Sequence, residues 1–392
     1  MPKSLRLIWS LSLGLTGIAA LAAACKSTQL NGAMSGPVAG RDAAGGAAGG
    51  VGRGVGGVGG VGGAEPVALD VLEQVHISSD QSAEHFQHAT TDVDFGHEQV
   101  SSAKIGITLE SPCFPFSGWA MPAVLPGQRW PEPCDAFDRT VSLTLDGAQL
   151  DSGGTPGVEL IRAITPFGGP LRVEADVTDV VNGLPGTHQL DLRIDTSSDA
   201  EGLVSGTKGE WIASVDLTLE HGTAPRHVLA VLPLVLETQT AVNAPAVPFE
   251  VPEGAGSARL EYRVTGHGAA LGLGTGCLGP AEEFCQRTHE LRLDGDLLTE
   301  LTPWRTDCAT LCTMTSNDSG YGPSSYCAEN PCGDPASVRA PRANWCPGSM
   351  TGPLLIEDPR LLVAGGHEFS RSIQRLASGG KWLVSATYFA FE

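Results

Sequence analysis

Short runs of alternating apolar and polar residues recur along the chain and restrict its fold more than any other feature. Four of them read TVSLTLDG, QLDLRIDT, WIASVDLTLE and ARLEYRVTG, and begin at Thr140, Gln189, Trp211 and Ala258. An apolar side chain at every second position indicates a strand with one buried and one solvated face. Proline and glycine separate the runs at short intervals, and no stretch shows a sustained helical period with caps. The pattern predicts an all-β chain built from sandwiches or jelly rolls.

The first 25 residues have the three regions of an export signal. Two basic residues precede an apolar run from Leu7 to Leu21, which three alanines close. The run is too short for a comfortable membrane span. Small residues ending at Cys25 resemble the bacterial lipobox, although Ala22 stands where leucine is usual. We therefore predict an exported bacterial protein, either a cell-envelope lipoprotein lipidated at Cys25 or a secreted protein.

Residues 26–65 are expected to form a disordered tether. The stretch from Gly32 to Gly63 is nearly all Gly, Ala and Val, and so offers too little side-chain surface to offset the entropy of ordering. Residues 66–392 exceed what one hydrophobic core usually serves. We expect two domains, 66–222 and 226–392, with the junction in the segment HGTAPR.

Charge and cysteine content limit the partners and the compartment. A formal net charge of −20 argues against nucleic acid and anionic lipid, so membrane contact is expected only through the N-terminal lipid, and the body is expected to be a monomer. Ten cysteines in an exported chain indicate disulfides. If lipid occupies Cys25, nine remain, and one thiol is left over or pairs between chains. The sequence contains no CxxC pair with further ligands, which is the pattern that would indicate a zinc site.

Three segments place charged or aromatic residues beside cysteines. They read CDAFDR from Cys134, CLGPAEEFCQRTH from Cys277 and RANWCPG from Arg342. Taken singly, each has an ordinary structural explanation: an ion pair at a strand start, a small cysteine-closed loop, and a turn anchored by a buried tryptophan. Their order along the chain is more specific than any one of them.

In this order the segments resemble the peptide N-glycosidase F family, secreted bacterial amidases that remove N-linked glycans from asparagine. Further matches are AITPFGG from Ala163, DVTD from Asp176, TGHG from Thr265 and EFCQRTH from Glu283. The resemblance extends from about Val75 to the C-terminus. It implies two side-by-side, eight-stranded antiparallel jelly-roll domains with the active site between them, and it requires neither cofactor nor metal.

The resemblance also assigns roles to single residues. The family's catalytic aspartate falls on Asp138, and its cysteine-loop glutamate falls on Glu283. Asp195 stands in place of a further site glutamate and is one methylene shorter. The remaining predicted substrate-binding residues are Arg139, Arg342, Trp345 and His267.

Disulfide pairing follows from the resemblance for six cysteines. It implies the pairs Cys113–Cys134, Cys277–Cys285 and Cys308–Cys346. Three more cysteines belong to an insertion without a template, and there we predict a Cys327–Cys332 disulfide that leaves Cys312 unpaired.

Two family tryptophans are missing. One of them corresponds to Ser197, and the one before the Gly-His turn has no counterpart, so sugar stacking is expected to be reduced. The long loop between Cys113 and Cys134 contains Trp119 and Trp130. These indoles either rebuild an aromatic platform near Asp138 or pack as a small satellite core.

The assigned residues suit hydrolysis of the carboxamide between N-acetylglucosamine and asparagine, with release of the glycan from N-linked glycopeptides or glycoproteins and conversion of Asn to Asp. Asp138 is expected to orient or deprotonate water, and Arg139 is expected to keep it ionised. Glu283 and Asp195 would hydrogen-bond the water or the sugar. Arg139 and Arg342 would stabilise developing charge.

Two alternatives from other classes stay open. A non-catalytic glycan-binding surface lipoprotein on the same fold is favoured by the missing tryptophans and by Asp195. A copper-dependent monooxygenase is suggested by the paired jelly rolls and by the HxxH of His85 and His88. Such copper sites need His-x-His and a methionine, and no His-x-His occurs in the sequence.

Overall fold

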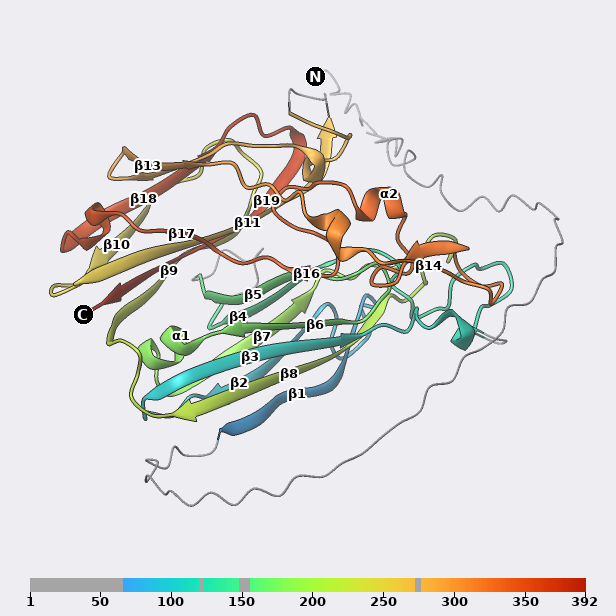
Figure 1. The fold of residues 1–392 in the computed structure, drawn as a ribbon, viewed down its shortest axis with the longest axis horizontal. Coiled ribbons are helices and arrows are strands. Elements are labelled where there is room, and N and C mark those ends of the chain that lie inside the picture. Colours follow the sequence, from blue (N-terminus) through green and yellow to red (C-terminus); the bar gives the residue numbers. More distant parts are fainter. Residues whose placement is uncertain (1–65, 120–122, 148–155, 272–275) are drawn as a thin grey trace, which may run out of the picture. The chain divides into compact units, whose positions relative to one another are not determined.

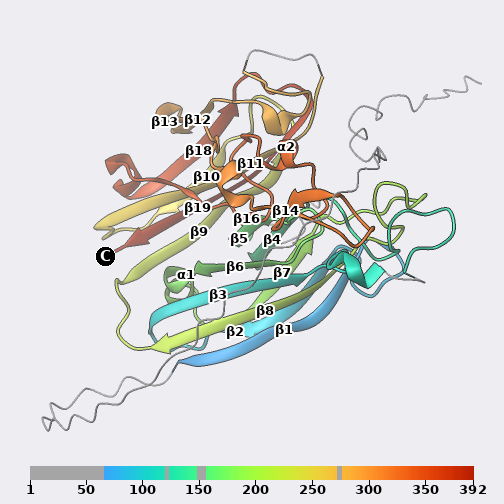
Figure 2. The same cartoon turned by 45° about the vertical axis from the view of Figure 1, so that its right-hand side comes forward.

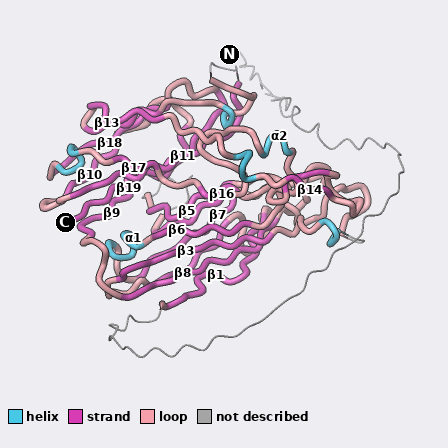
Figure 3. The backbone as a smooth tube through the Cα atoms, viewed as in Figure 1, coloured by secondary structure: helices cyan, strands magenta, loops and turns pink. Residues whose placement is uncertain are grey.

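The computed structural model describes residues 66–119, 123–147, 156–271 and 276–392. Strands form nearly all of the regular structure there, and the helices are short (Figure 3). The all-β prediction is confirmed. The expected signal, Cys25 and the glycine-rich tether lie outside the described residues. Within the described part of the chain, no helix is both long and apolar enough to cross a bilayer.

Two four-stranded antiparallel sheets, completed by one short strand from later in the chain, form the first jelly roll (Figure 1). The first sheet has the order β1 (Val67–Ser78), β8 (Glu210–His221), β3 (Val100–Glu110) and β6 (Leu171–Asp176). The second has the order β16 (Ser349–Met350), β5 (Val158–Ile164), β4 (Thr140–Leu145), β7 (Thr187–Ile194) and β2 (His88–Asp94). A short helix, α1 (Thr178–Gly183), follows β6.

The second jelly roll has the same plan. One sheet has the order β17 (Leu354–Ile356), β11 (Ser257–Leu271), β19 (Ser378–Phe391) and β9 (Val228–Gln239). The other has the order β10 (Val247–Val251), β18 (Gly365–Ile373), β12 (His289–Leu293) and β13 (Asp296–Leu301). The eight-plus-eight antiparallel architecture is therefore confirmed. The last strand of the first jelly roll ends at His221 and β9 begins at Val228, so HGTAPR lies between the two.

Shorter elements decorate the second jelly roll. They are the hairpin β14 (Met314–Ser316) and β15 (Ser325–Cys327), the helix α2 (Pro335–Val338), and the 3₁₀ turns η2 (Glu282–Phe284), η3 (Cys308–Leu311) and η4 (Pro359–Leu362). A further 3₁₀ turn, η1 (Phe116–Trp119), belongs to the first half. In the view of Figure 2, β14 lies beside the loop that carries η1.

Alternation along the strands becomes burial on one face. In β8 every second residue from Trp211 to Leu219 is buried, and the residues between them are partly exposed. Full burial of one such aliphatic or aromatic side chain contributes roughly 1.5–3 kcal/mol. Each jelly roll encloses its own apolar cluster in this way.

The outer faces of one sheet from each half pack together. Tyr262 of β11 points into the second core, whereas its neighbour Arg263 donates from the opposite face to the Glu159 carbonyl of β5 (2.6 Å). Arg162 of β5 donates in return to the Leu383 carbonyl of β19 (2.7 Å). Through such contacts the two jelly rolls belong to one compact unit.

A buried ionic cluster lies at this junction. Both Glu159 carboxylate oxygens accept from the Arg162 guanidinium, at 2.8 and 2.7 Å, and one also accepts from the Ser385 hydroxyl at 2.5 Å. Arg263 lies 3.5 Å from the same carboxylate. Burial alone would raise the pKa of Glu159, but the two arginines and these hydrogen bonds lower it. Glu159 is therefore charged, and its contacts with Arg263 and Ser385 join the first jelly roll to the second.

Candidate active site

The CDAFDR segment lies where three strands of one sheet end. Asp138 stands two residues before β4. The Thr165 amide, just after β5, donates to the Arg139 carbonyl (2.8 Å), and the Asp195 amide, just after β7, donates to the Thr140 carbonyl (3.0 Å). Antiparallel order brings the start of β4 and the ends of β5 and β7 to one edge. Asp138 and Asp195 consequently share that edge.

The second half reaches this edge through β16. Ser349 and Met350 pair with Ile164 and Ala163 of β5, and the Gly348 amide donates to the Ile164 carbonyl (3.0 Å). The RANWCPG segment comes directly before this pairing. The pairing of β16 with β5 therefore brings this segment of the second jelly roll to the edge that carries Asp138.

Arg139 is held by Asp135, a residue that the sequence analysis did not single out. Arg139 Nε donates to both Asp135 carboxylate oxygens, at 3.0 and 2.8 Å. Asp135 is fully buried and also accepts from the Thr196 hydroxyl (2.7 Å). The available signal was its position four residues before Arg139. The expected partnership of Arg139 with Asp138 is thus replaced by one with Asp135.

Glu283 and Arg342 form the matching pair from the second half. Arg342 is fully buried and donates to the Glu283 carboxylate at 2.5 Å, and the other end of its guanidinium donates to the Ser337 carbonyl and hydroxyl at 3.0 and 2.9 Å. The Glu283 side chain keeps 23% exposure. The Ala343 amide donates to the Glu283 carbonyl at 2.7 Å. These bonds fix the carboxylate while leaving it open to solvent.

The adjacent Glu282 has a structural role. Its carboxylate accepts from Arg287 at 2.6 and 2.8 Å and from the Trp382 indole at 3.1 Å, and all of its surface is buried. The Cys277–Cys285 disulfide closes the loop that contains both glutamates. The loop therefore directs one acid inward and the next one outward.

Trp345 and His267 lie behind Arg342. The Arg342 guanidinium carbon is 4.4 Å from the Trp345 ring centroid, and the His267 ring stacks on that indole at 5.3 Å. Trp345 is 1% exposed and its indole donates to the Gly266 carbonyl (2.9 Å). Burial, followed by the charges of Lys381, Arg162 and Arg342, lowers the pKa of His267 to about 3, so its ring is neutral. In this arrangement both rings support Arg342.

Asp138 carries the electrostatic signature of the site. Burial and then the Glu283 charge raise its pKa to about 7, against the opposing effects of Arg342 and Arg139. Each arginine is already paired with another carboxylate, Glu283 or Asp135. Among the described residues, no side chain donates a hydrogen bond to the Asp138 carboxylate. We expected from the sequence that Arg139 would keep Asp138 ionised. The Arg139 charge does lower the pKa of Asp138, but burial raises it by more.

Asp195 extends the same edge. Its side chain is 41% exposed and accepts from Arg193 Nε at 3.1 Å. Arg193 lies on the same face of β7, two residues earlier. Ser197, in place of a family tryptophan, is exposed and offers its carbonyl to Arg139 at 3.5 Å. The polar wall is thus present without the indole.

Trp119 and Trp130 form a satellite core. Trp119 is 5% exposed, donates its indole N–H to the Cys113 carbonyl (2.9 Å) and packs edge-on against Trp130 and Phe116. Tyr326 of the insertion joins the same cluster. The structure favours this packing role over a sugar platform.

Four disulfides occur among the described residues. Three join the pairs that the resemblance implied, namely Cys113–Cys134, Cys277–Cys285 and Cys308–Cys346. The fourth, Cys312–Cys327, corrects the predicted Cys327–Cys332 pair and the unpaired Cys312. Met314 pairs with Cys327 across the β14–β15 hairpin, which brings Cys312 alongside Cys327, while the Cys332 amide is bound to the Phe167 carbonyl elsewhere.

Comparison with known proteins agrees with this geometry. Residues 236–388 match the family model of the C-terminal domain of peptide-N-glycosidase F. The second jelly roll is therefore similar to the C-terminal domain of that family. The resemblance found in the sequence motifs is confirmed. No protein with curated annotation matches the chain in sequence.

Solved structures related to peptide-N-glycosidase F share the fold over most of the chain. PNGF-II superposes with a TM-score of 0.59 at 20% identity over 83% of this chain and 65% of its own. A peptide-N(4)-(N-acetyl-β-D-glucosaminyl)asparagine amidase gives 0.59 at 19% identity, over 84% and 96%. PNGase F, a glycosylasparaginase from Flavobacterium meningosepticum, gives 0.57 at 18% identity over the same shares. This chain thus spans about two thirds of PNGF-II and nearly all of the other two.

One group of three potential metal ligands occurs in the described part of the chain, Cys113, Cys134 and Cys332, and two of these are joined in a disulfide. His85 and His88 are not in any such group there. His88 instead pairs with Asp191 at 3.2 Å. The HxxH therefore gives no support to a copper site.

Proposed function

We propose that this protein is an exported amidase that cleaves the N-acetylglucosamine–asparagine bond of N-linked glycopeptides or glycoproteins. The observation that carries the proposal is the pKa of Asp138, raised to about 7 at an edge where both jelly rolls contribute charged side chains. Strongly perturbed groups of this kind concentrate at functional sites. The family of the C-terminal domain and the fold of the amidases support the same substrate class.

Asp138 is proposed as the general base. A base with a pKa close to neutral combines a useful ionised fraction with real proton affinity, which is the optimum for catalysis near pH 7. Its carboxylate takes a proton from water as the water oxygen attacks the amide carbon. That proton is then available for the departing glycosylamine. The Arg139 guanidinium, fixed by Asp135, stabilises the developing oxyanion.

Glu283 is proposed to bind the sugar from the other side. Its carboxylate is anchored by Arg342 at 2.5 Å and is partly exposed, so an oxygen remains for a hydroxyl or an amide N–H. Asp195 approaches from the β7 edge. Arg342 and Trp345 are too buried to contact a sugar in this conformation, and we assign them to positioning Glu283.

A glycan-binding protein without turnover is the second candidate. Ser197 lacks an indole, and Trp345 and Trp119 are buried. In the described part of the chain, the exposed aromatic ring next to Asp138 is that of Phe137, at 37%. Such a site would bind through Asp195 and Glu283 alone. The two candidates differ in whether the bound glycopeptide is cleaved, and one assay distinguishes them.

The test is incubation of purified protein with a denatured N-glycopeptide, followed by mass spectrometry. An amidase releases the intact glycan and leaves Asp in place of Asn, whereas an endoglycosidase leaves one sugar attached. Asp138→Asn should remove the activity while keeping the fold. Binding of several glycopeptide classes without release from any would overturn the amidase and establish the glycan-binding protein.

A further inference from the structure

Thr165, directly after β5, holds the main chain on both sides of Asp138. Its amide donates to the Arg139 carbonyl (2.8 Å), and its hydroxyl oxygen accepts from the Arg139 amide (2.8 Å). The same hydroxyl donates to the Phe137 carbonyl (3.4 Å). Thr165 is fully buried. The direction in which the Asp138 carboxylate points therefore depends on where Thr165 lies.

Asn330, in the insertion of the second half, holds the turn that follows Thr165. Its side chain is fully buried, and its Oδ1 accepts from the Phe167 amide (3.0 Å). A Cβ at Gly169, in the same turn, would lie only 2.7 Å from the Glu329 carbonyl. Glycine thus allows the insertion to approach the turn closely enough for the asparagine to reach it.

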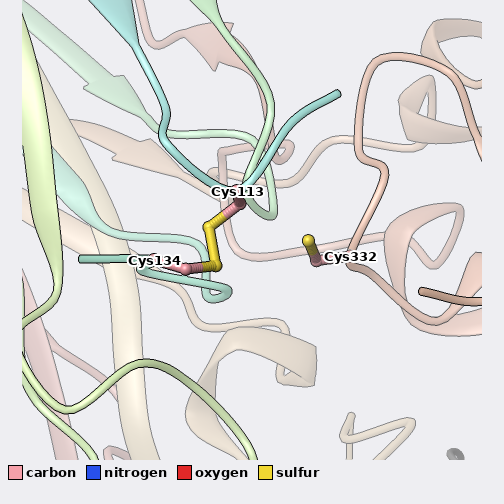
Figure 4. A group of neighbouring side chains, drawn as sticks. All are labelled: Cys113, Cys134 and Cys332. Atoms are coloured by element: carbon pink, nitrogen blue, oxygen red, sulfur yellow. A yellow bond between two sulfur atoms is a disulfide. The ribbon is translucent and has the colours of Figure 1, made fainter. Parts of the chain in front are cut away.

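The insertion packs directly on the first jelly roll. The Cys332 sulfur lies within 4.8 Å of both sulfurs of the Cys113–Cys134 disulfide, which belongs to the first half (Figure 4). Tyr326 packs edge-on against Phe116, with ring centroids 5.3 Å apart. These contacts fix the position of the insertion, and of its asparagine, relative to the first half.

The other end of the Asn330 amide faces the second half of the candidate active site. Its Nδ2 donates to the Pro347 carbonyl (3.4 Å) in the RANWCPG segment. The same segment contains Arg342, which holds the Glu283 carboxylate at 2.5 Å. One buried amide therefore joins the turn on which Asp138 depends to the segment that positions Glu283.

We propose that Asn330 and Thr165 are positioning residues that set the Asp138 carboxylate against Glu283. The Asn330 amide holds the Phe167 turn of one half against a carbonyl of the other, and Thr165 connects this turn to the main chain around Asp138. Both are fully buried, so neither contacts substrate. The effect on turnover rests on the proposed amidase function, in which a misplacement of about 1 Å can cost about 10²-fold in rate.

Asn330→Ala tests the role. It should lower kcat for glycan release by about 10–10²-fold and leave KM almost unchanged, because Glu283 and Asp195 keep their own arginine partners. The acid limb of kcat/KM should move to lower pH. Burial is the main cause of the raised pKa of Asp138, and a loosened edge admits water.

Asn182 of α1 is a matched control. Its Oδ1 accepts from the Val100 amide (3.0 Å) and its Nδ2 donates to the Val100 carbonyl (2.9 Å), so it bridges two segments in the same way. It lies before β7, whereas Asp195 follows the other end of that strand. Asn182→Ala should lower stability but leave kcat and the acid limb unchanged. Wild-type kcat and an unmoved limb in folded Asn330→Ala would overturn the proposal.

A pair of threonine variants keeps the test independent of folding in Asn330→Ala. Thr165→Ser retains the hydroxyl and should keep the wild-type kcat and acid limb. Thr165→Val has nearly the same shape without the hydroxyl, and it should show the lower kcat and the moved limb. Equal kcat values and limbs in the two folded variants would refute the role of Thr165.

Failure of the amidase function and failure of the positioning role give different results. A wild-type protein that releases no glycan disproves the amidase whatever the variants do. In that case carbon-13 NMR can follow the titration of the Asp138 carboxyl in place of turnover. Its midpoint should be lower in Asn330→Ala than in the wild type and in Asn182→Ala, and equal midpoints in all three proteins would disprove the positioning role.

Discussion

Two acids of this protein lie among arginines, Glu159 buried and Asp138 partly exposed, and their pKa values shift in opposite directions. Glu159 accepts three short hydrogen bonds from Arg162 and Ser385 and lies 3.5 Å from Arg263, and its pKa is lowered. Asp138 feels Arg139 and Arg342, yet its pKa is raised to about 7. The difference lies in how the arginines are used, since those near Asp138 are already paired with Asp135 and Glu283. Hydrogen bonds decide whether a buried acid stabilises the structure or is available for chemistry.

The largest expected effect is on activity at Asp138. Asp138→Asn should reduce glycan release by about 10²–10⁴-fold, because it removes the general base while keeping the size of the side chain. The same variant should be more stable than the wild type at pH 8. The raised folded-state pKa favours the protonated form, so wild-type stability falls as pH rises from 3.8 through about 7.

Urea denaturation of Asp138→Asn at pH 8 and pH 4 checks the sign. The variant's advantage should be roughly 1–3 kcal/mol at pH 8 and should vanish at pH 4. A variant that is less stable than the wild type at pH 8 would show that Asp138 is a structural acid like Glu159.

Glu159→Gln should lower the stability of the protein and leave the pH dependence of its activity unchanged. Removing one member of a buried charge cluster leaves Arg162 without its counter-ion, which typically costs about 3–5 kcal/mol. Chemical denaturation measures the loss. In the folded fraction, the pH dependence of activity should not change, and a moved acid limb would contradict the separation of the two clusters.

Asp135→Asn should weaken the site through Arg139. Without its carboxylate partner the guanidinium can turn toward Asp138 and lower the pKa of that acid, and misplacement of the arginine reduces turnover by up to about 10²-fold. The expected signature is a lower kcat together with an acid limb at lower pH. A change in KM alone would argue against this role.

Glu283→Gln should have the smallest and most specific electrostatic effect. The wild-type kcat/KM should rise with pH through about 7, because only ionised Asp138 acts as a base. Since the Glu283 charge raises that pKa, its removal should move the limb of the residual activity to lower pH. An unmoved limb would show that burial alone sets the pKa of Asp138.

The sequence predicted the architecture and the residues at the site better than it predicted the contacts among them. Period-two runs give the strands because alternation is a local property, and ordered motifs gave the family. The pairing of Arg139 with Asp135 rather than Asp138 depends on rotamers and on Thr196, which lies far along the chain. The burial of Trp345 likewise depends on strand β11, whose Gly266 carbonyl accepts the indole hydrogen bond from far along the chain.

The insertion shows the limit most clearly. Spacing made Cys327 and Cys332 natural neighbours, but the β14–β15 hairpin and the Phe167 carbonyl separate them. In a segment without a template, the pairing of cysteines depends on which parts of the backbone the segment packs against. These are tertiary contacts, and the local sequence does not show them. The same docking places Cys332 beside the Cys113–Cys134 disulfide.

The two-residue strand β16 has a consequence for how the molecule is made. It covers the outer edge of β5, but it stands near the end of the chain, so that edge stays open while most of the protein is being synthesised. An open edge strand invites pairing with other chains, and long-range closure is slow. The newly made protein should thus be most prone to aggregate in the interval before residues 349–350 arrive, and any chain truncated before them should keep that edge exposed permanently.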